Sequence, residues 1–271
     1  MKRIFIIGIA RSGSTLLQSI LASHPKIQSF PETHFFSFLP KQKIFRFFSF
    51  ISIKGNKVVE DYLSRNKLNK NNKYVPLFTF SKKKWVRKMV KILDSITIKN
   101  KKMIWVEKTP LHLYHTDLIK SVYQETFFIH ILRNGQDNIA SLFDASIKYP
   151  DTFKQKSIES CINRYKKEIN ISLANKNKEN HFFVRFEDIV SNPKKTIENL
   201  IKQLNIEYHP DMINFQDNVS DIIEKNEHWK EGNYKEIQNN NNKFSEIFSI
   251  DEQNFINNKI NNIDLNIFNY D

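Results

Sequence analysis

The first residues that could do chemistry form a glycine turn near the N-terminus. An apolar run over residues 4–7 leads into Gly8, and Gly13 follows with the spacing of a P-loop, but Ser14 stands where that motif has its lysine. A strand, a glycine turn and a helix N-terminus still present backbone N–H groups and a positive dipole end to an oxyanion. The sequence therefore predicts an anion site that lacks the usual grip on a nucleoside triphosphate, which disfavours a kinase or a GTPase.

Arg11 can supply the missing positive charge in this loop. Hydroxyl groups from neighbouring serines and a threonine would suit a compact group that carries one phosphate and one further anion. The string over residues 11–15 resembles the 5′-phosphosulfate loop of sulfotransferases that use 3′-phosphoadenosine 5′-phosphosulfate (PAPS), in its Arg-Ser-Gly-Thr-Thr form. An ordinary strand, turn and helix is the alternative. The resemblance implies that PAPS is held by Arg11, Ser12, Gly13, Ser14, Thr15 and Leu16.

A second cation follows the apolar run over residues 127–132. This run is typical of a buried parallel strand, and Arg133 stands at its carboxyl end, where ligands bind in an open parallel sheet. An arginine can bind a phosphate in a bidentate manner. The pattern of Arg133 with Ser141 on the next helix resembles the 3′-phosphate motif of the same family, which implies that both residues bind that phosphate. The alternative is that Arg133 only caps the strand.

A third block has the same organisation. Residues 181–190 contain a strand, and Pro193 opens an amphipathic helix. This block resembles the Arg-Tyr-Glu-Asp-Leu segment of the family, except that Phe186 replaces the tyrosine. We therefore expect no polar contact from position 186.

Two further side chains are predicted to act on the reacting group. The apolar strand over residues 103–108 ends in Lys108, within a Lys-Thr-Pro segment similar to one that several carbohydrate and protein sulfotransferases place beside the sulfuryl group. The resemblance implies that Lys108 and Arg11 are catalytic cations, whereas a solvated strand-end lysine is the alternative. The spacing of Glu32 from Arg11 resembles that in tyrosylprotein sulfotransferases, in which the corresponding glutamate is the base. The alternatives are that Glu32 contacts a cationic group of the acceptor or simply a neighbouring lysine, and that His34 or His112 is the base.

These residues require an α/β fold. We predict a P-loop-like, three-layer domain over residues 1–271, with a central parallel sheet of about five strands flanked by helices; the number of strands comes from the resemblance and from ordinary sheet sizes. A helical insertion at about 41–101 is predicted to roof the acceptor site, and it includes a helix near 81–98. Within it, the Phe-rich run 43–51 suits an acceptor pocket, a membrane-touching patch or plain core. Residues 238–271 are predicted to form a surface loop and a packing helix.

The composition of the chain limits the classes of partner that we expect. The net charge is +13, which favours an anionic ligand, although lysine-rich exposed positions are also what an AT-rich genome produces. No nucleic-acid signature is visible, and one cysteine, Cys161, argues against a disulfide or a thiolate metal cluster. No apolar run reaches the length of a membrane span, and the first strand begins too early for a signal peptide. We expect a cytoplasmic protein that binds no nucleic acid, with peripheral membrane contact as an option.

The resemblance implies transfer of a sulfuryl group from PAPS to a hydroxyl or amine acceptor by in-line displacement, with no metal. The acceptor class stays open among carbohydrate, lipid, peptide tyrosine and small alcohol. The alternatives are a nucleotide or sugar kinase with a degenerate P-loop and a non-catalytic anion-binding protein of the same fold.

Overall fold

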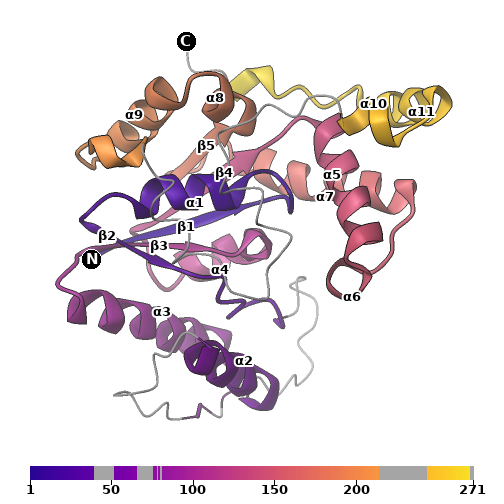
Figure 1. The fold of residues 1–271 in the computed structure, drawn as a ribbon. Helices are drawn as coiled ribbons and strands as arrows, with labels where there is room; N and C mark the ends of the chain where they lie inside the picture. The colour runs from indigo at the N-terminus through magenta and orange to yellow at the C-terminus, as the bar shows by residue number, and fades with distance from the viewer. Residues whose placement is uncertain (40–51, 66–75, 78, 80, 214–242, 269–271) are drawn as a thin grey trace.

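A single parallel sheet of five strands forms the centre of the molecule in a computed structural model, which describes residues 1–39, 52–65, 76, 77, 79, 81–213 and 243–268 (Figure 1). The strands are β1 (Lys2–Gly8), β2 (Ile27–Phe30), β3 (Ile104–Lys108), β4 (Thr126–Leu132) and β5 (His181–Arg185). All adjacent pairs are parallel, and the spatial order is β2-β3-β1-β4-β5. The predicted α/β class and the predicted number of strands are confirmed. Because the strands are parallel, all their carboxyl ends lie at one edge.

Four of the strands lie where apolar runs predict them, whereas β2 has no such signal. It consists of four residues and includes two polar side chains, Gln28 and Ser29. It is an edge strand paired only with β3, so only part of it needs to be buried. A run this short and this polar does not stand out from a loop in the sequence.

Helices cover both faces of the sheet. Within the described residues the α-helices are α1 (Ser14–Ala22), α2 (Ser52–Arg65), α3 (Lys82–Lys99), α4 (Thr116–Lys120), α5 (Gly135–Lys148), α6 (Pro150–Phe153), α7 (Ile158–Leu173), α8 (Phe186–Ser191), α9 (Pro193–Gln203), α10 (Lys243–Ile247) and α11 (Ile250–Ile260). Short 3₁₀ turns are η2 (Pro110–His115), η3 (Pro210–Met212) and η6 (Asn266–Phe268). In Figure 1, α1, α8 and α9 lie above the sheet, and α2, α3 and α4 lie below it.

The upper layer buries aliphatic side chains. Leu17 and Ile20 of α1 pack with Ile197 and Leu200 of α9 against the strands, and all four are fully or nearly fully buried. The apolar residues of α9 recur at helical spacing, which is why this helix lies flat on the sheet with its lysines outward.

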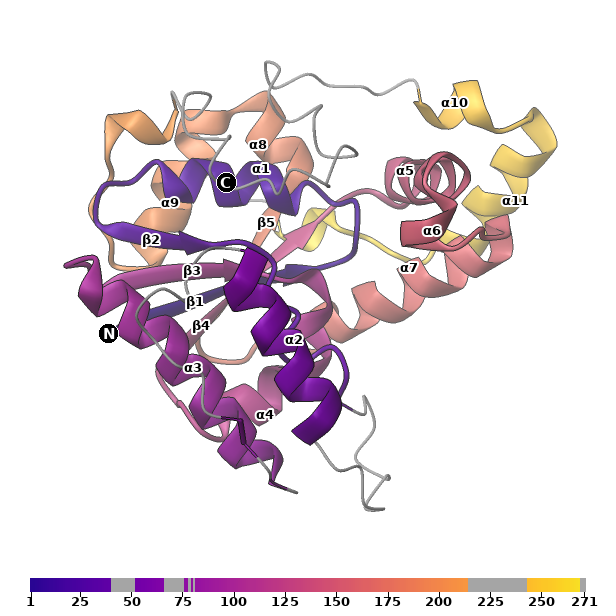
Figure 2. The same ribbon diagram turned by 60° about the horizontal axis from the view of Figure 1, so that its bottom comes forward.

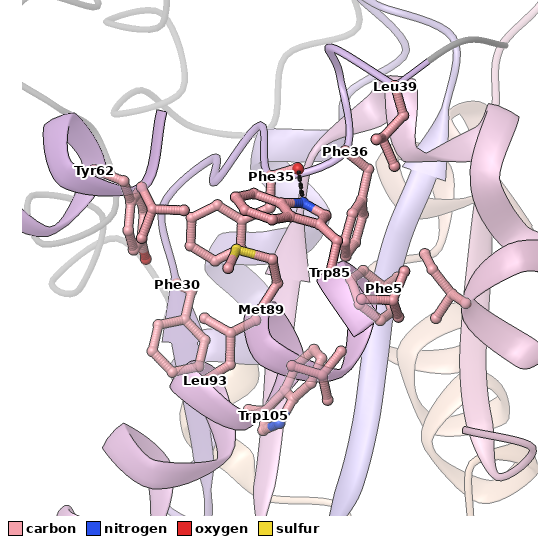
Figure 3. Close-up of a cluster of buried hydrophobic side chains, with 14 of the residues drawn as sticks. Phe5, Phe30, Phe35, Phe36, Leu39, Tyr62, Trp85, Met89, Leu93 and Trp105 are labelled. Carbon is pink, nitrogen blue, oxygen red and sulfur yellow. Dashed lines mark hydrogen bonds between the residues drawn. The ribbon is translucent and has the colours of Figure 1, made fainter. Parts of the chain in front are cut away.

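The lower layer is aromatic. The indole of Trp85 in α3 packs among Phe30, Phe35 and Met89, and its Nε1–H donates to the Phe35 carbonyl at 2.9 Å (Figure 3). This face of α3 matches the predicted helix near 81–98. Burial of large aromatic side chains with a satisfied indole N–H is a strong source of packing energy. The hydrogen bond ties the segment that follows Glu32 to the helical layer.

A third cluster joins the C-terminal segment to the domain. Helices α5, α7, α10 and α11 lie together on one side of the molecule (Figure 2) and pack around Leu132 and Phe183 of the sheet. In α11, Ile256 is fully buried and Phe255 is 41 % exposed. Cys161 is buried in α7.

The predicted roof over the acceptor site stays a prediction. The described helices of the 41–101 segment, α2 and α3, pack on a face of the sheet with residues such as Val59 and Met89 buried there. The Phe-rich run 43–51 lies outside the described residues, as do residues 238–242 of the C-terminal segment.

Two histidines face each other inside the sheet, on β4 and β5. His130 Nε2 lies 2.8 Å from His181 Nδ1, and the rings stack on Phe183 and Phe128 respectively. Burial lowers the pKa of His181 to about 4, and it lowers the pKa of His130 as well. Both rings are therefore neutral in the folded protein at neutral pH.

This pair predicts a defined acid sensitivity. Since the pKa of His181 is lower in the folded than in the unfolded chain, its contribution to stability is complete above pH 6.5 and is lost as the pH falls toward about 4. We expect the loss to be about 2 kcal/mol once solvent screening is allowed for. Urea unfolding across this pH range should show a shallower decline for His181→Asn than for the wild type. Equal declines in the two proteins would contradict the assignment.

Candidate active site

The loop between β1 and α1 is held in an uncommon backbone conformation. Arg11 has φ 68° and Gly13 has φ 87°, both in the left-handed region. A Cβ at Gly13 would lie 2.3 Å from the Phe186 ring, so this position needs glycine for space as well as for conformation. Left-handed backbone at a non-glycine residue costs free energy and often marks a functional site.

This loop ends at a helix N-terminus without a side-chain cap. Gly13 is the N-cap of α1 and offers no side-chain oxygen, and the first backbone bond runs from the Leu17 N–H to the Gly13 carbonyl. The preceding amides of Ser14 and Thr15 therefore have no intrahelical acceptor. The N-terminus of α1 can bind an anion through these N–H groups and its dipole.

Two arginines, Arg11 and Arg133, lie beside this helix end. Arg11 Nε donates to Ser141 Oγ at 3.3 Å, and Arg133 Nη1 donates to the Arg11 carbonyl at 3.2 Å. Burial lowers the pKa of both arginines, and Arg133 lowers that of Arg11 further. Two partly desolvated cations, close enough for one to lower the pKa of the other, favour a ligand that carries more than one negative charge.

Arg133 is held by its neighbours on both sides. Its guanidinium lies over the Phe186 ring, 4.6 Å from the centroid, and its backbone carbonyl accepts from the Tyr165 hydroxyl at 3.2 Å. Asn134 caps α5 directly after it. Within the described ranges, the buried Arg133 Nε–H has no hydrogen-bond partner. The Phe186 ring thus makes a cation–π contact with Arg133, and the unpaired N–H marks a place for an acceptor atom of a ligand.

On the other side of β1, Glu32 and Lys108 form an ion pair. Lys108 Nζ donates to Glu32 Oε1, and the two side chains are 2 % and 18 % exposed respectively. His34 Nε2 lies 3.4 Å from Glu32 Oε2. Burial lowers the pKa of His34, although Glu32 acts in the opposite direction. A carboxylate, an ammonium group and a neutral imidazole thus lie together.

A buried network holds this pair in place. Glu107, fully buried at the end of β3, accepts from the Thr33 N–H at 3.2 Å and the Thr33 hydroxyl at 3.0 Å, and it also accepts from the Thr109 hydroxyl. His112 Nδ1 lies 3.1 Å from its other oxygen. Burial by itself would raise the pKa of Glu107, but His112 and the hydrogen bonds keep it below its ordinary value. Because Thr33 and Thr109 adjoin the ion pair, Glu107 links the two segments that carry it.

One cavity of about 380 Å³ brings the predicted residues together at the carboxyl edge of the sheet. It is lined by Ala10, Arg11, Gly13, Ser14, Thr15, Glu32, His34, Thr109, Pro110, Leu111, Arg133, Ser141, Thr152, Phe153, Arg164 and Phe186. Lys108 reaches it through Glu32. Four of the lining residues, Leu111, Thr152, Phe153 and Arg164, belong to no local sequence motif that predicts a site.

Besides Lys108, three predicted residues lie outside this lining. The Ser12 hydroxyl donates to the Ile9 carbonyl at 2.6 Å and is fully buried, so it shapes the loop, and Leu16 belongs to the core. His112 is fully buried, with one ring nitrogen near Glu107 and the other accepting from the Phe36 N–H at 3.4 Å. Of the two histidines proposed as bases, His34 alone lines the cavity. In the described part of the chain no group of three His, Cys, Asp or Glu residues is arranged to hold a metal ion.

A helix N-terminus, two arginines and a carboxylate–lysine pair surround one cavity, an arrangement that can bind an anionic group. The family model described as "Sulfotransferase family" matches residues 3–210, so the chain belongs to the sulfotransferase family. Comparison with curated proteins finds no match.

Solved structures show the same fold at low identity. The sulfotransferase domain from the curacin biosynthetic pathway is 16 % identical, with a TM-score of 0.61 over 96 % of this chain and 97 % of that chain. The sulfotransferase domain of the Synechococcus PCC 7002 olefin synthase is 17 % identical, with a TM-score of 0.62 over 98 % of this chain and 96 % of that chain. Mouse sulfotransferase SULT7A1, solved with PAP, is 11 % identical, with a TM-score of 0.56 over 97 % and 86 %.

Proposed function

We propose that the protein transfers a sulfuryl group from PAPS to a hydroxyl or amine of an acceptor. The observation that carries the proposal is the cavity in which the uncapped N-terminus of α1, Arg11 and Arg133 face the Glu32–Lys108 pair. Membership of the sulfotransferase family supports the reaction, and the PAP complex of the mouse protein supports the donor.

The residues present fit such a donor. The amides of Ser14 and Thr15 at the start of α1 would hold the 5′-phosphosulfate, together with Arg11. Arg133, with its unpaired Nε–H, and Ser141 would hold the 3′-phosphate. When bound, PAPS supplies the sulfuryl group, whose bond to the phosphate oxygen breaks as the bond to the acceptor oxygen or nitrogen forms.

The Glu32–Lys108 ion pair couples removal of the acceptor's proton to stabilisation of negative charge on the leaving phosphate. Glu32 takes the proton of the acceptor, which neutralises its carboxylate. Lys108, which bonds that carboxylate in the free site, then has its positive charge available for negative charge on the leaving phosphate. Arg11 and the α1 amides add further positive potential. We propose Glu32 as the base and place His34, its neighbour in the cavity, as the alternative.

Thermal unfolding with nucleotides tests the donor. We expect PAP to raise the melting temperature more than ADP or ATP does, because Arg133 and Ser141 are assigned to the 3′-phosphate. Ligand at about a hundred times its dissociation constant adds about 2.7 kcal/mol to the free energy of unfolding, which a melting curve resolves. Arg133→Ala should abolish the preference for PAP, whereas Arg87→Ala, on the exposed side of α3, should retain it. Equal shifts with ADP would favour the kinase alternative.

A second expected result is activity without divalent metal. Arg11, Lys108 and the loop amides are proposed to supply the positive charge that Mg²⁺ supplies in kinases. Sulfuryl transfer measured by mass spectrometry should therefore persist in excess EDTA. A strict requirement for Mg²⁺ would contradict this assignment.

We also propose a cytoplasmic location and no nucleic-acid partner, which cell fractionation and a nucleic-acid binding assay would test. In the part of the chain that the structure describes, no helix is both long enough and apolar enough to cross a membrane. Peripheral contact with an anionic membrane would use the exposed basic side chains of α3, which include Lys83, Lys84, Arg87 and Lys91. The acceptor classes consistent with this arrangement are carbohydrate, lipid, peptide tyrosine and small alcohol.

A further inference from the structure

A second hollow continues from the donor cavity. It has a volume of about 420 Å³ and lies between η2 and α7, lined by Leu111, Tyr114, Asn163, Arg164, Lys167 and Glu168. Leu111 and Arg164 also line the donor cavity, so the two hollows share a wall. We call the second hollow the η2–α7 groove.

Along the chain, the residues of η2 that line this groove follow directly after Lys108. Lys108 ends β3, and Thr109 and Pro110 line the donor cavity before Leu111 reaches the shared wall. Tyr114 lies one turn further along η2. An acceptor whose hydroxyl lies at Glu32 would therefore extend past Leu111 into the groove.

The groove carries an excess of positive charge. Arg164 Nε donates to Glu168 Oε1 at 3.1 Å, and the Tyr114 hydroxyl donates to the same oxygen at 3.3 Å. Glu168 is 1 % exposed, so its carboxylate lies beneath the surface and holds the guanidinium from one side. Arg164 lines both hollows, so its side chain lies at the shared wall. Lys167 is exposed and lies over the Tyr114 ring, 5.7 Å from its centroid.

We propose that the η2–α7 groove binds the acceptor and selects one that carries a carboxylate or a phosphate away from its reacting hydroxyl. Arg164 and Lys167 are one helical turn apart on the same side of α7 and bind that anionic group, with Glu168 as the positioning residue for Arg164. The inference rests on the proposed sulfuryl transfer and adds the chemical class of the acceptor.

Matched acceptor pairs test the selection. We would supply PAPS with 4-hydroxyphenylacetate or its amide, 3-hydroxyoctanoate or its amide, and glucose 6-phosphate or glucose. For the hydroxyl type that is used, we expect kcat/KM for the anionic member to exceed that for the neutral member by about tenfold, the effect of one charge-assisted hydrogen bond. Calorimetry with PAP-saturated protein should show binding of that anionic member.

Variants of α7 separate this role from a general charge effect. Lys167→Gln should lower the ratio for the pair, with Arg164 retaining part of the preference, and Lys167→Glu should lower it further, whereas Lys166→Gln, at a position outside the groove lining, should keep the wild-type ratio. The proposal is overturned if neutral members are used equally well, if no anionic probe binds, or if Lys166→Gln has the effect of Lys167→Gln. Failure of PAP to bind would instead reject the proposed function, and probe binding to the free protein would still test the groove.

Discussion

Glu32→Gln is expected to lower turnover by roughly 10² to 10⁴ while leaving PAP affinity nearly unchanged. The substitution keeps the size of the side chain and a hydrogen-bonding oxygen for Lys108, but it removes the group that accepts the proton. Glu32 lines the cavity and is 18 % exposed, so an acceptor can reach it. Steady-state turnover and calorimetric titration with PAP would measure the two quantities on the same preparation.

An acceptor series separates a base from a positioning group. A more acidic hydroxyl loses its proton more readily, so it should partly restore the turnover of Glu32→Gln. Intact turnover in Glu32→Gln, combined with loss in His34→Ala or His112→Ala, would show that a histidine is the base. Because His112 is buried with both ring nitrogens in contact, loss of turnover in His112→Ala requires a check of folding.

Lys108→Ala is expected to lower turnover by roughly 10² to 10³, through lost stabilisation of the leaving phosphate. A more acidic acceptor should not restore this loss, since the missing interaction is on the other side of the transferred group. Lys108→Arg, which retains the charge, should recover part of the activity. Single-turnover kinetics would show whether the loss lies in the transfer step.

The direct ion pair between Glu32 and Lys108 allows a further test with a double variant. If Glu32 and Lys108 act as a unit, the double variant should lose much less than the product of the two single losses. Fully multiplicative losses would indicate that the two side chains act independently. Rescue of Lys108→Ala by an acidic acceptor would place Lys108 on the acceptor side and contradict the assignment.

Local sequence signals predicted the residues that we propose to bind the anionic donor. A backbone anion site needs only a strand, a glycine turn and a helix start, all of which lie within residues 4–21. The same holds for Arg133, which directly follows an apolar strand. The family resemblance supplied the chemical roles proposed for Glu32 and Lys108. The glycine turn and Arg133 were predictable because each depends on neighbours close in the chain.

The sequence did not reveal which side chains complete the cavity from a distance. Phe153 and Arg164 belong to helices whose apolar spacing predicts packing but not what the polar side meets. The Glu107 network joins β2 to β3, and β2 itself escaped detection because its burial depends on a partner strand rather than on its own apolar run. Such contacts depend on long-range packing.

By itself, the sequence determined β1, β3, β4 and β5, the glycine turn and the cations near their ends, because backbone geometry and apolar spacing are local properties. The tertiary structure decided which of these residues meet. β1 lies between β3 and β4, so the loops that carry Arg11, Lys108 and Arg133 end side by side at one edge. Only that strand order places Glu32 against Lys108 and joins the donor cavity to the groove beside α7, since sheet order is set by packing across the whole domain.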